Sequence, residues 1–164
     1  MSKNKSENTK IEIKNFEEYE KATREGAELF NAGKYEEALG VFLAMVAYHP
    51  NNYKIYETLA TIYLKTGDAD EAARRLEQAY AILGKEKEIV IQMRDLKEVV
   101  AELDDLETLE KEYHASIENP QKSDDPAPVR LPIQMGLHYM ATGDYKKAEE
   151  LLTQHLERYQ NSKN

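Results

Sequence analysis

Gly33-Lys-Tyr-Glu-Glu-Ala38 is the stretch that decides the fold, because something close to it occurs three times in the chain. It returns as Gly67-Asp-Ala-Asp-Glu-Ala72 and again as Gly143-Asp-Tyr-Lys-Lys-Ala148. The first two copies are 34 residues apart, and the third follows 76 residues after the second, which is two periods and 8 residues. A fixed period of this length is typical of repeat proteins, in which one supersecondary unit is stacked several times.

A pair of helices is predicted around each copy of this motif. Apolar residues at helical spacing precede each glycine, and a second apolar stripe follows it. Glycine can end the first helix because it takes the left-handed conformation without a side-chain penalty. We therefore expect helices on both sides of Gly33, Gly67 and Gly143, with Pro50 ending the first pair and Gly84 the second.

The pattern resembles the tetratricopeptide repeat (TPR), a helix–turn–helix unit of this length. In the first unit the matching positions are Gly26, Leu29, Gly33, Tyr35, Ala38, Phe42 and Pro50. In the second they are Tyr56, Leu59, Ala60, Tyr63, Gly67, Ala72, Leu76 and Ala79. In the last they are Met135, Gly136, Tyr139, Gly143, Tyr145, Ala148 and Leu152. The last unit departs from the pattern at Pro132 and His155, where an aromatic residue and an alanine are usual.

This resemblance implies an all-α fold, a short TPR-like α-solenoid of antiparallel helix pairs with a long or degenerate central helical segment. Residues 1–15 carry too little apolar surface to offset the entropy of ordering, so we expect a disordered N-terminal tail before a domain at 16–164. The predicted parts of that domain are units at about 19–52 and 53–86, a degenerate unit at 87–118, a loop at 119–128 and a unit at 129–160. Pro132 is expected in the first turn of its helix, where a missing amide does little harm.

Composition excludes several classes of function. The formal net charge of -9 argues against nucleic acid or an anionic membrane as the partner. Without cysteine the chain has no disulfide framework, thiolate metal site or cysteine nucleophile. The first ten residues lack the apolar core of a signal peptide, and no run reaches transmembrane length. We expect a cytoplasmic protein without cofactor or metal.

The segment 85–118 contains neither glycine nor proline and leaves two interpretations open. Its apolar residues follow a coiled-coil-like spacing that changes phase after Leu103, from Ile89, Met93, Leu96, Val100 and Leu103 to Leu106, Leu109, Tyr113 and Ile117. One interpretation is a long helix, and the other is a degenerate repeat that turns near Asp104-Asp105. Residues 101–118 also hold seven acidic side chains and one lysine, which predicts a solvated acidic face.

The resemblance also implies a concave groove, lined by the first helix of each unit, that binds a peptide or a partner helix. By family position the groove residues are Thr23, Ala27, Phe30, Asn31, Glu57, Thr61, Leu64, Lys65, Ile133, Leu137, Met140 and Ala141. Phe30, Leu64 and Met140 occupy equivalent positions, which favours an apolar or amphipathic ligand. The alternative is that segment 85–118 or the N-terminal tail fills the groove, which would make these residues core.

The sequence gives little support for a carboxylate clamp, a metal site or a catalytic site. The lysine and asparagine positions of a carboxylate clamp, known in some family members, carry Thr23, Ala27 and Thr58 here. His138 and His155 fall on different helices of the last unit and could approach each other, but no histidine pair has metal-ligand spacing on one helix. No nucleophile, base and orienting group appear together, so we predict that the protein is not an enzyme.

The predicted function is therefore a protein–protein interaction module, a scaffold or adaptor whose partner is another protein or peptide. One alternative is a small secretion-type chaperone that holds an amphipathic client segment. Another is a structural protein that forms a homodimer or larger oligomer through the 85–118 helix.

Overall fold

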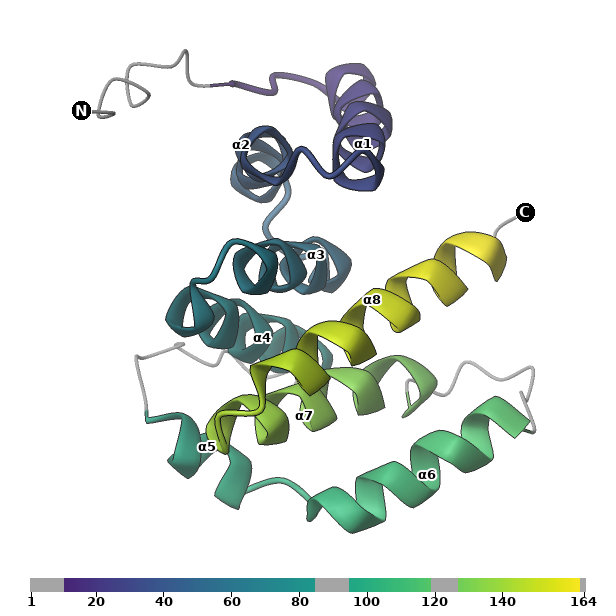
Figure 1. Ribbon diagram of the computed structural model, residues 1–164. Helices are drawn as coiled ribbons and strands as arrows, with labels where there is room; N and C mark the ends of the chain where they lie inside the picture. Colours follow the sequence, from purple (N-terminus) through teal and green to yellow (C-terminus); the bar gives the residue numbers. More distant parts are fainter. Residues whose placement is uncertain (1–10, 85–94, 119–126, 163–164) are drawn as a thin grey trace.

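The computed structural model describes residues 11–84, 95–118 and 127–162. These residues form helices and connecting turns and no strand, which confirms the predicted all-α fold. The helices are α1 (Phe16–Asn31), α2 (Tyr35–Tyr48), α3 (Tyr53–Lys65), α4 (Ala69–Gly84), α5 (Leu96–Ala101), α6 (Leu106–Glu118), α7 (Ala127–Ala141) and α8 (Tyr145–Ser162). Figure 1 shows α1 to α4 stacked from the top of the molecule downward, with α7 continuing below α4.

The three motif glycines make the turns within the helix pairs, as the sequence predicts. Gly33, Gly67 and Gly143 have positive φ angles of 78°, 89° and 83°. After each glycine the next amide bonds back to a carbonyl five residues earlier, as in Lys34 N–H to Leu29 O at 2.9 Å. This bond is the Schellman closure of a helix end, which requires a left-handed residue.

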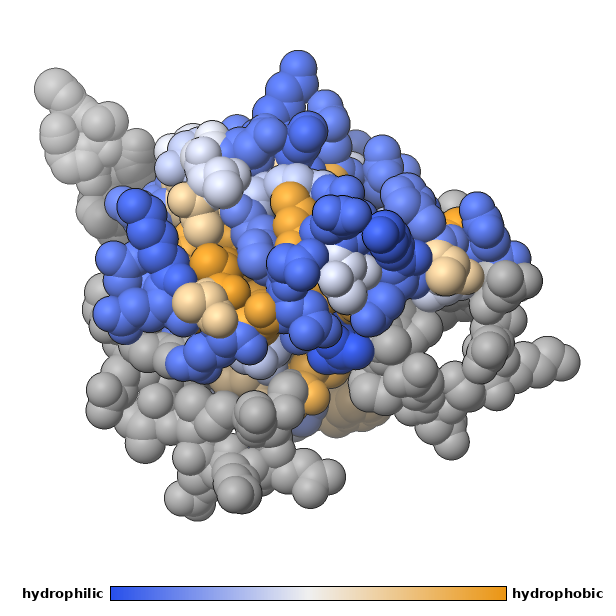
Figure 2. Space-filling view, turned by 90° about the horizontal axis from the view of Figure 1, so that it is seen from below, coloured by the Kyte–Doolittle hydropathy of each residue, from blue (hydrophilic) through white to orange (hydrophobic). Residues whose placement is uncertain are grey.

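The stack passes directly from the second unit to the last, because α4 packs against α7 just as α2 packs against α3. The described part of the predicted degenerate unit at 87–118, residues 95–118, therefore does not form a layer between them. Instead α5 and α6 both pack against α7, burying Val99, Leu109 and Tyr113. Most of the apolar side of α5 and α6 is thus packed within the chain, although Ile117 is 40% exposed. Figure 2 shows the underside of the molecule, where most of the surface coloured by hydropathy is hydrophilic and apolar side chains emerge in small separate groups.

The interpretation of segment 85–118 as a single long helix is wrong for the part that the structure describes. α5 ends at Ala101 and α6 begins at Leu106, so the chain turns at 102–105, where the alternative interpretation placed a turn. Asp105 starts α6 because its Oδ1 accepts the Thr108 amide at 2.9 Å and satisfies a free donor of the first turn. Residues 85–94 lie outside the described part of the chain.

Two further expectations need correction. Pro132 is the sixth residue of α7 and lies inside the helix, because α7 already begins at Ala127. The predicted tail is too long, because Ile13 packs against the core cluster of α1 and α2, and Asn15 caps α1 by accepting the Glu18 amide. The loop predicted at 119–128 falls mainly on residues 119–126, which the structure does not describe.

The last helix departs most from a regular stack. α8 packs against its partner α7, and it also packs against α3 in the preceding unit. Figure 1 shows α8 running obliquely across the front of the stack and rising to the right, on the side where α1 lies. This oblique path decides how much of the concave face stays open.

Candidate functional site: a pocket between α1, α3 and α8

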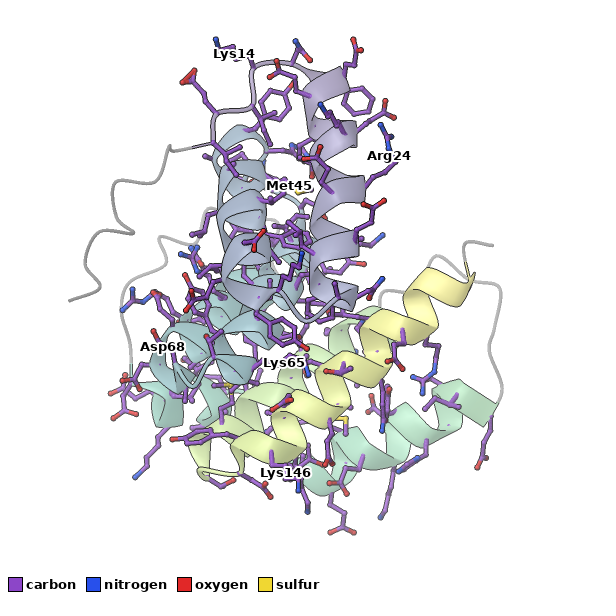
Figure 3. All side chains as sticks on the ribbon, turned by 45° about the horizontal axis from the view of Figure 1, so that its top comes forward. Lys14, Arg24, Met45, Lys65, Asp68 and Lys146 are labelled. Carbon is purple, nitrogen blue, oxygen red and sulfur yellow. The ribbon has the colours of Figure 1, made fainter. Side chains whose placement is uncertain are left out.

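α8 covers the part of the concave face that α3 contributes. Glu57 and Thr61, both predicted groove residues, are 1% and 0% exposed. Lys65, at the end of α3, donates a hydrogen bond from its Nζ to Glu149 Oε1 on α8 at 2.9 Å. Figure 3 shows Lys65 where the end of α3 meets α8. This cover comes from the chain's own last helix, while residues 1–10 of the predicted tail lie outside the described part of the chain.

The groove positions of the last unit also lie inside the protein. Ile133, Leu137 and Met140 belong to a core cluster that includes Val99 of α5, and Leu64 packs against the same cluster. Ala141 is half-buried at the end of α7. In this arrangement none of the three buried side chains is offered to a ligand.

The first-unit positions have a different environment. Thr23, Ala27, Phe30 and Asn31 line one side of a pocket of about 540 Å³. The opposite sides come from the start of α3, including Glu57, and from His155 and Leu156 of α8. The structure therefore brings five of the predicted groove residues together at one open site.

The wall of this pocket is largely apolar. Its apolar side chains come from α1, α2, α3 and α8, and they are Ala27, Phe30, Phe42, Met45, Ile55 and Leu156. Polar groups lie between them. The Asn52 Nδ2 amide donates to the Tyr19 hydroxyl at 3.2 Å, and Asn52 Oδ1 caps α3 by accepting the Lys54 amide. An apolar wall with a few placed polar groups is typical of a ligand pocket.

One charged group is buried at this site. The Glu57 carboxylate lines the pocket, yet no described residue donates a hydrogen bond to either of its oxygens. His155 Nε2 lies 3.1 Å from Glu57 Oε2, without hydrogen-bond geometry, and the two form an ion pair only when the imidazole is protonated. Burial and the Glu57 charge raise the pKa of the neighbouring Tyr53 to about 12.

Sequence reasoning missed the contribution of α8. Apart from the expected approach to His138, the one available signal at His155 is its departure from the small residue usual at that position. The expectation that His138 and His155 could approach each other is wrong, since His138 Nε2 contacts the Asp104 carbonyl at 2.9 Å while His155 lies beside Glu57. Within the described ranges, no cluster of three or more potential metal ligands occurs.

Comparison with known families agrees with this geometry. Two family models, both described as tetratricopeptide repeat, match residues 29–89 and 133–163, which together make up more than half of the chain. The chain belongs to the tetratricopeptide repeat family. Neither the curated proteins nor the solved structures contained a significant match.

Membership of this family carries a general consequence. Tetratricopeptide repeats generally mediate protein–protein interaction and are generally non-catalytic. In the described part of the chain, no helix has the length and apolar character needed to span a membrane.

Proposed function

We propose that this protein is an adaptor that binds a segment of another protein in the pocket between α1, α3 and α8. The observation that carries the proposal is the difference in burial between the groove positions of the first unit and those of the other units. The chain's own helices bury Thr61 of the second unit and Ile133, Leu137 and Met140 of the last unit, while the first unit's positions, together with Glu57, line an open, largely apolar pocket.

The size of the pocket favours a short anchored segment over a long peptide. Its volume of about 540 Å³ lies within the range of ligand pockets, roughly 300–1,000 Å³. Binding energy in protein complexes is concentrated in a few buried side chains, so one or two anchor residues in this pocket can supply most of the affinity. The remainder of the partner would lie on α1 and α8 around the opening.

Phe30 offers a direct test. It lines the pocket on α1, whereas Phe16 on the same helix is 64% exposed and does not line it. The partner is first identified by affinity capture from the native cell and then purified. We expect Phe30→Ala to weaken its binding at least about tenfold by calorimetry, and Phe16→Ala to leave binding unchanged. Equal affinity of both folded variants and wild type would contradict a role for the pocket.

A further inference from the structure

We propose that the inner end of this pocket binds a basic side chain, a lysine or arginine of the partner segment, with Glu57 as its counter-ion. This inference deepens the proposed function and rests on it. It concerns the chemistry of the anchor residue, which neither the repeat pattern nor the family assigns.

The unsatisfied carboxylate is the first observation. Glu57 is 1% exposed, and neither of its oxygens has a hydrogen-bond partner among the described residues. Burying a charged group costs free energy unless it is paired, and in a protein such a group is usually paired or hydrogen-bonded. His155 Nε2 lies 3.1 Å from Oε2 without directing a hydrogen bond to it, and Oε1 also has no hydrogen-bond partner among the described residues.

The apolar wall is the second observation, and it suits the rest of a basic side chain. Lysine and arginine carry an aliphatic stem that packs on apolar surface while the charged end reaches a polar group. Here Met45 and Ile55 belong to the same wall as Glu57. The aromatic rings of Tyr19, Phe30 and Tyr53 also line the pocket, and such rings attract cations over their faces.

The other titratable groups around the pocket are compatible with its preference for a basic side chain. Besides Glu57, the titratable groups that line the pocket are Tyr19, Tyr53, Lys54 and His155. Lys54 Nζ lies over the Tyr53 ring, 5.8 Å from its centroid. The chain as a whole carries a formal charge of -9, which attracts a basic segment over a longer range.

A pair of small probes isolates the charge from the apolar contact. Hexylammonium and 1-hexanol have the same chain, but only the first is charged, and their binding can be followed by amide chemical shifts in an NMR titration. We expect the wild-type protein to bind hexylammonium at least about tenfold more tightly than hexanol, with the largest shifts at residues around Glu57. Glu57→Gln should remove most of this preference, while Glu28→Gln, an exposed change on α1, should preserve it.

The outcomes separate this inference from the proposed function. Equal affinity of wild type for both probes, or an unchanged preference in Glu57→Gln, would overturn the basic anchor. If Glu57→Gln does not fold, the affinities of the wild-type protein for the two probes decide the question by themselves. With the purified partner, loss of binding in Phe30→Ala but full affinity in Glu57→Gln would overturn the basic anchor and leave the pocket proposal standing. Full affinity in both variants would overturn the proposed function itself.

Discussion

At Gly26 the close approach of two helices leaves no room for a side chain. At Gly26 on α1, an added Cβ would lie 2.9 Å from the Cζ atom of Phe42 on α2. The Phe42 ring is itself buried in the cluster that joins α1, α2 and α3. The missing side chain at Gly26 therefore allows the two helices of the first unit to cross at this distance.

Gly26→Ala should destabilise the protein by about 1 kcal/mol. Alanine gains roughly 0.5–1 kcal/mol of helix propensity over glycine, but the displaced Phe42 ring costs about 1–3 kcal/mol. Gly40→Ala is the matched control on α2, because its Cβ would meet only Ile11 Cδ1 at an ordinary 3.9 Å. Urea denaturation should show a loss for the first variant and a small gain for the second. A gain for Gly26→Ala would refute the close-packing explanation.

Two tyrosines should make stability depend on alkaline pH. Burial and the Glu57 charge raise the pKa of Tyr53 to about 12, and burial with a hydrogen bond to Glu110 raises the pKa of Tyr139 to about 12. Because both folded pKa values exceed the unfolded value near 10, the contribution to stability is complete below about pH 10 and is lost as the pH rises toward 12.

The matching measurement is urea denaturation at about pH 9 and about pH 11.5. The free energy of unfolding should fall between these values in wild type. It should fall less in a Tyr53→Phe/Tyr139→Phe variant, which has no phenol to titrate at these positions. An equal fall in both proteins would assign the pH dependence to other groups.

At the scale of elements, α8 combines two roles. It completes the last helix pair with α7, and it also covers α3. The contact with α3 includes the Lys65–Glu149 ion pair, whose side chains are 18% and 34% exposed. Although burial of Lys65 opposes its charge, the hydrogen bond and the charge of Glu149 raise the pKa of Lys65 overall.

Coupling between Lys65 and Glu149 should therefore exceed that of an exposed pair. A double-mutant cycle with Lys65→Met and Glu149→Gln is expected to give a coupling energy of about 1 kcal/mol. Lys21 and Glu25 on α1, 71% and 54% exposed at 3.9 Å, form the control pair, for which about 0.3 kcal/mol is expected. If both cycles give the same value, the contact between α8 and α3 does not depend on this ion pair.

At the scale of the whole molecule, α3 occupies the centre. It contacts α2, α4 and α8, and Leu59, Ala60 and Ile62 are fully buried there. By contrast, α6 packs mainly against α7, and its acidic residues are exposed except Glu110, which accepts a hydrogen bond from Tyr139. Stability within a folded protein varies with such contacts, so the two helices should open with different free energies.

Hydrogen exchange followed by mass spectrometry should detect this difference. The amides of α3 are expected to exchange slowest, and those of α6 markedly faster. A variant with Leu152→Ala, which removes a buried α8 side chain, should accelerate exchange in α7 and α8 and lower stability by about 2–5 kcal/mol. Uniform protection across α3 and α6 would show that the molecule opens only as one unit.

Local sequence determined the helix pairs. The turns at Gly33, Gly67 and Gly143 and the buried positions Ala38 and Ala72 depend on neighbouring residues and on a period that repeats, so they were predictable without a structure. The position of Thr23, Ala27, Phe30 and Asn31 along one face of α1 follows in the same way, because the direction of a side chain on a helix is set locally.

Only the tertiary structure decided what covers those faces. Lys65 and Glu149 are 84 residues apart, and Glu57 meets His155 across a similar distance in sequence. The repeat pattern describes the fit of each helix to its immediate partner and to the next unit. It carries no information on the oblique path of α8, which depends on the free energy of packing all helices together. That path closes the concave face over α3 and leaves the pocket at the first unit, while the last unit's positions are buried in a cluster that includes Val99 of α5.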